Sequence, residues 1–138
     1  GKMALLIEWN ESLSVGVSEI DRQHMKLVGL INKLHHAMSE GHAKDVMSQI
    51  LDEMISYTDE HFKTEEKYFH QFKYIKTVEH MREHKNFVNT ALQLQSDFKS
   101  GKLGISVGTM EFLKDWLTKH IQGSDKEYTK CFNENGLH

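Results

Sequence analysis

Proline is absent from the 138-residue chain, and cysteine occurs once, at Cys131. Because proline interrupts helices, its absence permits long, regular ones. A single cysteine cannot form a disulfide within the chain, which favours a reducing compartment, and we expect a cytoplasmic protein. No apolar run approaches the roughly 20 residues that a membrane-spanning helix needs, and no signal peptide is visible. We therefore expect this domain not to insert into a membrane.

An excess of positive charge is also lacking. The formal net charge is -3, and Lys and Arg are interleaved with Asp and Glu along the chain. Attraction to nucleic acid needs clustered positive charge, so we expect no nucleic-acid partner. The length predicts one domain spanning residues 1–138. Because Met3 is internal to the start "GKMALL", we expect either an excised part of a larger protein or a cloning remnant at this end.

The sequence contains four amphipathic segments. Ser18 is the expected N-cap of the first helix, with Asp21 at its third position, and Gly41 is its expected end. The predicted helices cover residues 18–41, 45–70, 76–99 and 109–122, and the residues through 130 either continue the last helix or form a short extra one. Long apolar stripes joined by short loops predict an all-α, up-down-up-down four-helix bundle over about residues 18–130.

Histidine is abundant, with 10 in the chain, and five of them accompany two carboxylates at helical spacing. These seven candidate metal ligands are His24, His61, Glu65, His80, His84, His120 and Asp125. The pairs 61/65 and 80/84 are four residues apart, which places both members on one helix face. Imidazoles and carboxylates without thiols suit iron, zinc or copper. Seven ligands exceed the needs of one four-coordinate zinc ion, so we predict two octahedral metals that share the carboxylates.

The last ligand pair does not have regular helical spacing. His120 and Asp125 are five residues apart, which is about 140° around a regular helix. We therefore expect a local widening of the helix at Gly123, because such bulges often occur at functional sites.

A lone histidine on an apolar face is more often a core residue with a satisfied hydrogen bond than a metal ligand. Seven residues at matched spacing favour the metal site, because burying so many polar groups without a partner is costly. The other five histidines fit no ligand pair and are expected to be exposed or structural: His35, His36, His42, His70 and His138.

The motifs H-x-x-x-E, H-x-x-x-H and H-x-x-x-x-D, preceded by the histidine of "IDRQH", closely resemble those of the hemerythrins. The resemblance is nearest to the bacterial hemerythrin domains and extends from Trp9 to Tyr128. It implies an extended N-terminal arm, residues 1–17, across the bundle. It also implies two non-haem iron ions with an oxo or hydroxo bridge. One iron would be held by His80, His84 and His120, the other by His24 and His61, with Glu65 and Asp125 bridging both.

The same resemblance implies reversible O2 binding, for O2 or redox sensing or for carriage or storage. It implies an O2-binding protein and not an enzyme, with side redox activity left open. Leu117 and Ile121 are the candidate walls of the O2 pocket, with Trp116 and Phe87 packed outside them. Bacterial relatives occur alone or fused to chemotaxis receptors, so fusion to a larger receptor protein stays open.

The alternative function is a di-iron redox enzyme: a peroxidase, an oxidase or a nitric-oxide-handling protein. Ferritin-like oxidases use E-x-x-H pairs, which this chain lacks. A hydrolytic zinc site is disfavoured because H-E-x-x-H is absent.

Overall fold

The computed structural model describes residues 5–41, 44–101 and 107–138. Its long helices are α1 (Ser18–Ser39), α2 (Lys44–Phe72), α3 (Thr77–Lys99) and α4 (Val107–His120). A short 3-10 helix η1 (Glu11–Leu13) precedes them, and a π-helical turn η2 (Ile121–Asp125) and a short helix α5 (Thr129–Glu134) follow. The described ranges contain no strand. The last long helix continues through η2, and α5 follows as a short extra helix, so each of the two alternatives is realised in part.

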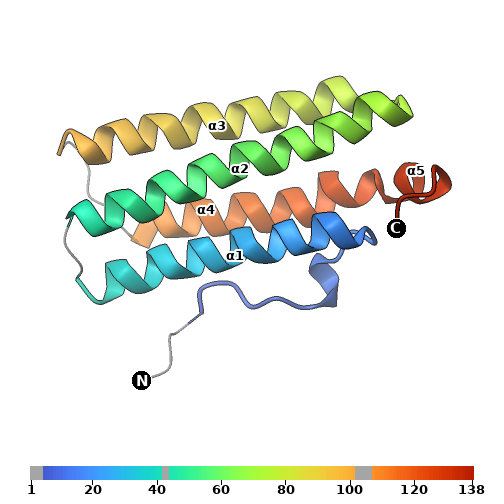
Figure 1. Cartoon of the computed structure of the whole chain (residues 1–138). Coiled ribbons are helices and arrows are strands. Elements are labelled where there is room, and N and C mark those ends of the chain that lie inside the picture. Colours follow the sequence, from blue (N-terminus) through green and yellow to red (C-terminus); the bar gives the residue numbers. More distant parts are fainter. Residues whose placement is uncertain (1–4, 42–43, 102–106) are drawn as a thin grey trace.

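The four long helices run side by side in alternating directions, as Figure 1 shows. This confirms the predicted all-α, up-down-up-down bundle. The beginnings of α1 and α3 and the ends of α2 and α4 lie at the same end of the bundle, next to α5. Residues near those four helix ends can therefore meet, although they are far apart in the sequence.

The first helix is not capped as predicted. Val17 is the N-cap residue, Ser18 is already helical, and no side chain caps the helix. Asp21 instead accepts hydrogen bonds from the backbone N–H of Val15 at 2.8 Å and from the hydroxyl of Ser14 at 2.6 Å. The capping-box prediction is wrong because this carboxylate binds the arm that leads into the helix. The predicted end is confirmed, since Gly41 follows the C-cap with a φ of 68°.

The described part of the N-terminal arm, residues 5–17, runs beside α1 and returns to the beginning of that helix (Figure 1). The backbone of this arm forms hydrogen bonds with the side chain of Asn32, which is 4% exposed. The Asn32 amide oxygen accepts from the N–H groups of Leu6 and Ile7, and its nitrogen donates to the carbonyl of Ile7, all at 2.9 Å. Because one buried amide pairs these backbone groups, the arm is held in an extended form without a neighbouring strand.

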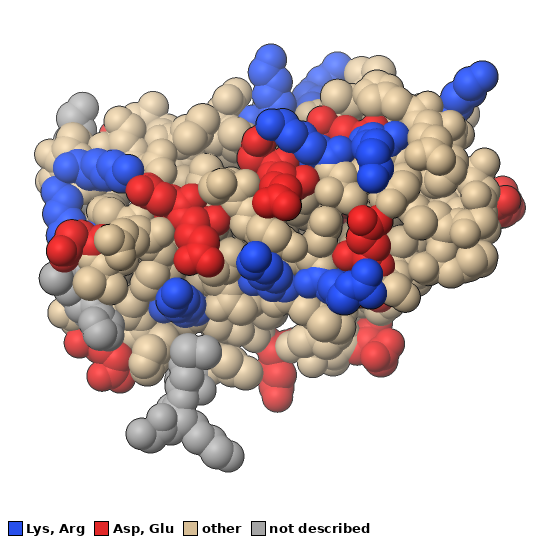
Figure 2. All heavy atoms as spheres, in the orientation of Figure 1, with Lys and Arg blue, Asp and Glu red and all other residues tan. Residues whose placement is uncertain are grey.

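On the face drawn in Figure 2, basic and acidic side chains are interspersed over the helices. Among the described residues, no helix combines the length and apolar character that crossing a membrane requires.

Candidate metal centre

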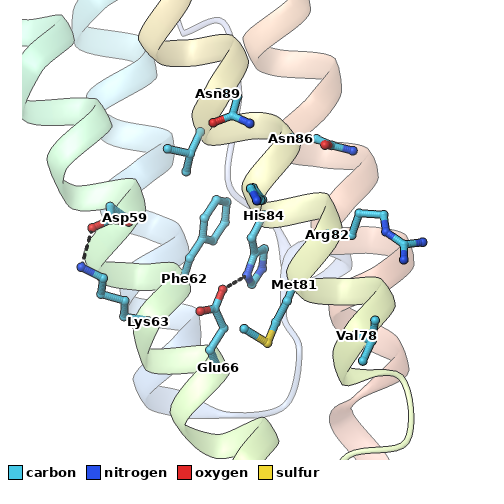
Figure 3. Close-up of a pocket in the computed structure, with 12 residues that line it drawn as sticks. Asp59, Phe62, Lys63, Glu66, Val78, Met81, Arg82, His84, Asn86 and Asn89 are labelled. Carbon is cyan, nitrogen blue, oxygen red and sulfur yellow. Dashed lines mark hydrogen bonds and ion pairs between the residues drawn. The ribbon is translucent and has the colours of Figure 1, made fainter.

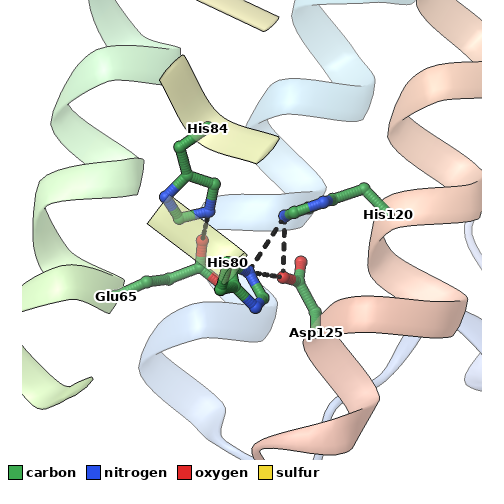
Figure 4. Close-up of side chains that lie close together, drawn as sticks. All are labelled: Glu65, His80, His84, His120 and Asp125. Atoms are coloured by element: carbon green, nitrogen blue, oxygen red, sulfur yellow. Dashed lines mark hydrogen bonds and ion pairs between the residues drawn. The ribbon is translucent and has the colours of Figure 1, made fainter. Parts of the chain in front are cut away.

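The structure brings all seven predicted ligand residues together at one end of the bundle interior. Each is at most 6% exposed. Their donor atoms form two groups in which all atoms lie within 4.8 Å of one another. The larger group, drawn in Figure 4, comprises Glu65, His80, His84, His120 and Asp125, and the smaller comprises His24, His61, Glu65 and Asp125. The two carboxylates belong to both groups, which is the arrangement that bridging ligands require.

The helical register changes between His120 and Asp125. Ile121–Asp125 forms the π-helical turn η2, which adds one residue to the turn and places positions i and i+5 on the same face. His120 Nε2 consequently lies 2.9 Å from Asp125 Oδ1. The expected widening is confirmed, and it directs Asp125 into the bundle interior.

Three of the histidines are held by polar residues on their outer side. His61 Nδ1 lies 2.7 Å from Gln23 Oε1, His84 Nδ1 lies 2.9 Å from Glu66 Oε2, and His120 Nδ1 lies 3.3 Å from Glu83 Oε2. An oxygen acceptor at Nδ1 holds a proton there, so Nε2 is the ring nitrogen that faces the centre. Ligand histidines in metalloproteins are typically oriented in this way.

These three supporting residues were missed by sequence reasoning, although each is adjacent in sequence to a predicted ligand. Gln23 precedes His24, Glu66 follows Glu65, and Glu83 precedes His84. Each, however, supports a histidine on the next helix and not its own neighbour. The pairing depends on how the helices pack, so the sequence alone showed only polar neighbours.

Tyr128 is a further residue that the sequence did not identify. It is fully buried, and its hydroxyl donates to Glu65 Oε2 at 2.6 Å. Burial and the nearby carboxylates of Glu65 and Asp125 raise the pKa of Tyr128 well above its ordinary value, so it stays a donor. Glu65 is thereby fixed on its outer oxygen while its Oε1 faces the histidines.

The protonation states of His61 and of the two shared carboxylates suit cation binding. Burial lowers the pKa of His61 to about 4, so this imidazole is neutral near pH 7. Burial opposes ionisation of Asp125, but His120, His24 and His80 outweigh it and hold the pKa of Asp125 well below its ordinary value. Burial and Asp125 oppose ionisation of Glu65, yet His61 and His84 lower its pKa as well. Both shared carboxylates are therefore anionic in the protein interior.

Six buried polar atoms of the predicted ligands have no hydrogen-bond partner among the described residues. They are His24 Nδ1 and Nε2, Glu65 Oε1, His84 Nε2, and both carboxylate oxygens of Asp125. Several approach one another closely all the same, as His84 Nε2 and Glu65 Oε1 do at 3.1 Å. Each unsatisfied buried polar group costs about 1–3 kcal/mol. Converging lone pairs and anionic oxygens without donors fit a pair of cations, so the donor set fits the predicted metals.

The predicted pocket residues Leu117 and Ile121 are buried in the core and lie within three residues of His120 in the chain. Leu117 is 5% exposed and Ile121 is fully buried. Trp116 stacks on His120 with ring centroids 4.5 Å apart, and on Phe87 at 4.1 Å.

A surface groove of about 680 Å³ between α2 and α3 reaches the site from outside. Phe62, Glu66, Met81 and His84 are among the residues that line it. In Figure 3 the Glu66–His84 pair lies inside this groove.

The remaining histidines lie outside the donor groups in the described residues. His35 and His36 are half-buried on α1, and His70 and His138 are exposed. His42 lies outside the described residues.

Fold and site together define a four-helix-bundle protein whose interior holds two buried donor groups that could bind metal ions. The family described as "Hemerythrin HHE cation binding domain" matches residues 15–131 of the chain. The chain belongs to the hemerythrin family. Membership implies non-haem iron at this cluster of histidines and carboxylates.

Individual relatives agree with this assignment. A bacteriohemerythrin of Methylococcus capsulatus is 32% identical, covering 95% of this chain and 99% of the relative. A hemerythrin-like protein of Naegleria gruberi is 33% identical, covering 87% and 88% of the two chains. The crystal structure of a wild-type hemerythrin superposes with a TM-score of 0.87 at 31% identity, covering 91% of this chain and 97% of that chain.

Proposed function

We propose that this protein binds O2 reversibly at a non-haem di-iron centre. The observation that carries the proposal is the pair of buried donor groups that share Glu65 and Asp125. A pair of ferrous ions supplies the two electrons that O2 takes up on binding and returns on release. The two anionic carboxylates offset half of the charge of such a pair, and the histidines complete the donor set as neutral imidazoles.

In this proposal the two metal positions have different numbers of ligands. His80, His84 and His120 hold one metal, whereas His24 and His61 hold the other. With one protein ligand fewer, the second position offers room for an external ligand. Because both carboxylates would be shared, the two positions differ only in their number of histidine ligands. We therefore propose that O2 binds at the two-histidine position.

Leu117 and Ile121 are proposed to wall that open position. Both are buried apolar side chains that flank His120 in sequence, at 5% and 0% exposure. Apolar walls exclude water and proton donors, which limits irreversible oxidation while O2 is present. We further propose that the function is exerted in the cytoplasm.

The biological role that we propose is O2 or redox sensing, with carriage or storage as the other outcome. The support is a connection between the site and the arm, because Gln122 of η2 donates to Ser12 of η1 at 3.1 Å. Since η2 also carries Asp125, a change at the metal centre is mechanically linked to the arm. Hydrogen exchange should show that protection of residues 5–17 changes with oxidation state. Equal protection in both states would instead favour carriage or storage.

Iron analysis with visible spectroscopy tests the function directly. The protein, loaded anaerobically with ferrous iron, should hold two irons per chain and should develop a visible spectrum with O2 that reverts when O2 is removed. Rapid, irreversible conversion to the diferric state would identify a redox enzyme instead. His61→Ala should lose iron, whereas His70→Ala, which changes an exposed histidine outside the site, serves as the matched control.

A further inference from the structure

The residues that support the ligand histidines from outside are not chemically equivalent. In the three-histidine group two of the three histidines have a carboxylate acceptor, Glu66 for His84 and Glu83 for His120. In the two-histidine group the acceptor for His61 is the neutral amide of Gln23. Among the described residues none supports His24, whose Nδ1 is buried without a hydrogen-bond partner there. The outer support is therefore anionic on one side of the centre and neutral or absent on the other.

The orientation of the Gln23 amide follows from its other contacts. Its Nε2 donates to the hydroxyl oxygen of Thr64 at 3.2 Å, and that hydroxyl itself donates to the carbonyl of Glu60 at 3.2 Å. The amide nitrogen is thus committed to Thr64, and Oε1 must be the atom that faces His61. The histidine can only donate to it, so its Nδ1 carries the proton.

A carboxylate acceptor strengthens an imidazole as a metal donor more than an amide does. The negative charge polarises the Nδ1–H bond and raises electron density at Nε2, and outer partners of this kind typically change metal affinity by about 10–100-fold. The side chains of Glu66 and Glu83 are 24% and 47% exposed. Because solvent screens partly exposed charges, we expect effects near the lower end of that range.

We infer that the two metal positions fill in order, the three-histidine position first, and that Glu66, Glu83 and Gln23 set this order as positioning residues. Gln23 keeps the two-histidine position the weaker and more exchangeable of the two. The inference rests on the dinuclear centre proposed above. It concerns the difference in metal affinity between the two positions, and not whether either position binds a metal.

Zn2+ titration of the metal-free protein tests the order, because Zn2+ is diamagnetic and the imidazole ring signals can be followed by NMR. The first equivalent should shift the rings of His80, His84 and His120, and the second should shift those of His24 and His61. Simultaneous shifts of all five rings, or filling in the reverse order, would overturn the inference. Failure to bind two equivalents at all would instead reject the dinuclear centre itself.

Charge substitutions test the cause. Glu66→Gln keeps an oxygen that can accept from His84 Nδ1 but removes the charge, so the first binding step should weaken about 10-fold while the ring tautomer of His84 stays the same. The matched control is Glu60→Gln, which removes a charge from an exposed position of the same helix. Equal effects of the two variants would show that the outer carboxylate does not set the affinity.

The opposite substitution adds charge to the weaker side. Gln23→Glu should strengthen the second step about 10-fold and so reduce the separation between the two steps. Gln71→Glu, at an exposed position near the end of α2, controls for added negative charge in general. A second step that Gln23→Glu leaves unchanged or weakens would contradict the assignment of Gln23.

Discussion

The hydrogen bond from Tyr128 to Glu65 offers a quantitative test of how the metal-free site is stabilised. Tyr128→Phe removes one hydroxyl and leaves the ring, which stacks on Phe132 with centroids 4.3 Å apart. The lost bond is buried, 2.6 Å long and accepted by a carboxylate. Such bonds contribute about 1.5–3 kcal/mol, so the unfolding free energy should fall by that amount. The folded-to-unfolded ratio then drops about 10–150-fold, since 1.4 kcal/mol is a factor of ten.

Urea unfolding of the metal-free protein, followed by circular dichroism, measures this change. Tyr74→Phe is the matched control, because the Tyr74 hydroxyl is buried but has no hydrogen-bond partner in the described part of the chain. Removing an unsatisfied hydroxyl should be neutral or slightly stabilising. If both variants lose the same stability, the effect comes from the buried ring environment, and the argument about Glu65 is refuted.

Further predictions concern the ligands and the turn that carries Asp125. His61→Ala and Asp125→Ala should each abolish the di-iron absorption, as visible spectra of reconstituted protein would show, and an unchanged spectrum would exclude the residue as a ligand. Replacing Ile121 by a potential ligand such as His should retain iron by elemental analysis but impair O2 binding. Burial opposes protonation of His120, but Asp125 and Glu83 outweigh it and raise the pKa of His120 to about 10 in the metal-free protein. Its proton must leave when Nε2 binds metal, so the affinity for metal should increase with pH up to about 10. Calorimetry in buffers of different ionisation enthalpy would detect the released proton, and metal binding that does not depend on pH would contradict this prediction. The Gly123→Ala variant should fold normally, because a Cβ there meets nothing within 4 Å, and its unfolding free energy, measured by thermal unfolding, should rise by up to about 1 kcal/mol. Disruption of the site would show that the π-helical turn needs glycine.

The helices and the candidate ligands could be predicted because both depend on local spacing. Apolar stripes and the four-residue spacing of His61 and Glu65 follow from helix geometry alone, whatever the helix packs against. The five-residue spacing of His120 and Asp125 even indicated the irregular turn, which the structure contains. The predicted capping box failed because Asp21 had a competing partner in the arm, a contact that no local pattern records.

Fold class and donor chemistry could be derived from the residues in order, because helical periodicity and side-chain type are properties of short segments. Which ligand each outer residue supports follows from the packing of the helices: Glu66 contacts His84 on α3, and Tyr128 donates to Glu65 on α2. These pairings depend on the rotation and axial offset of neighbouring helices. Packing of the whole core sets both, so they cannot be derived from residues adjacent in the chain.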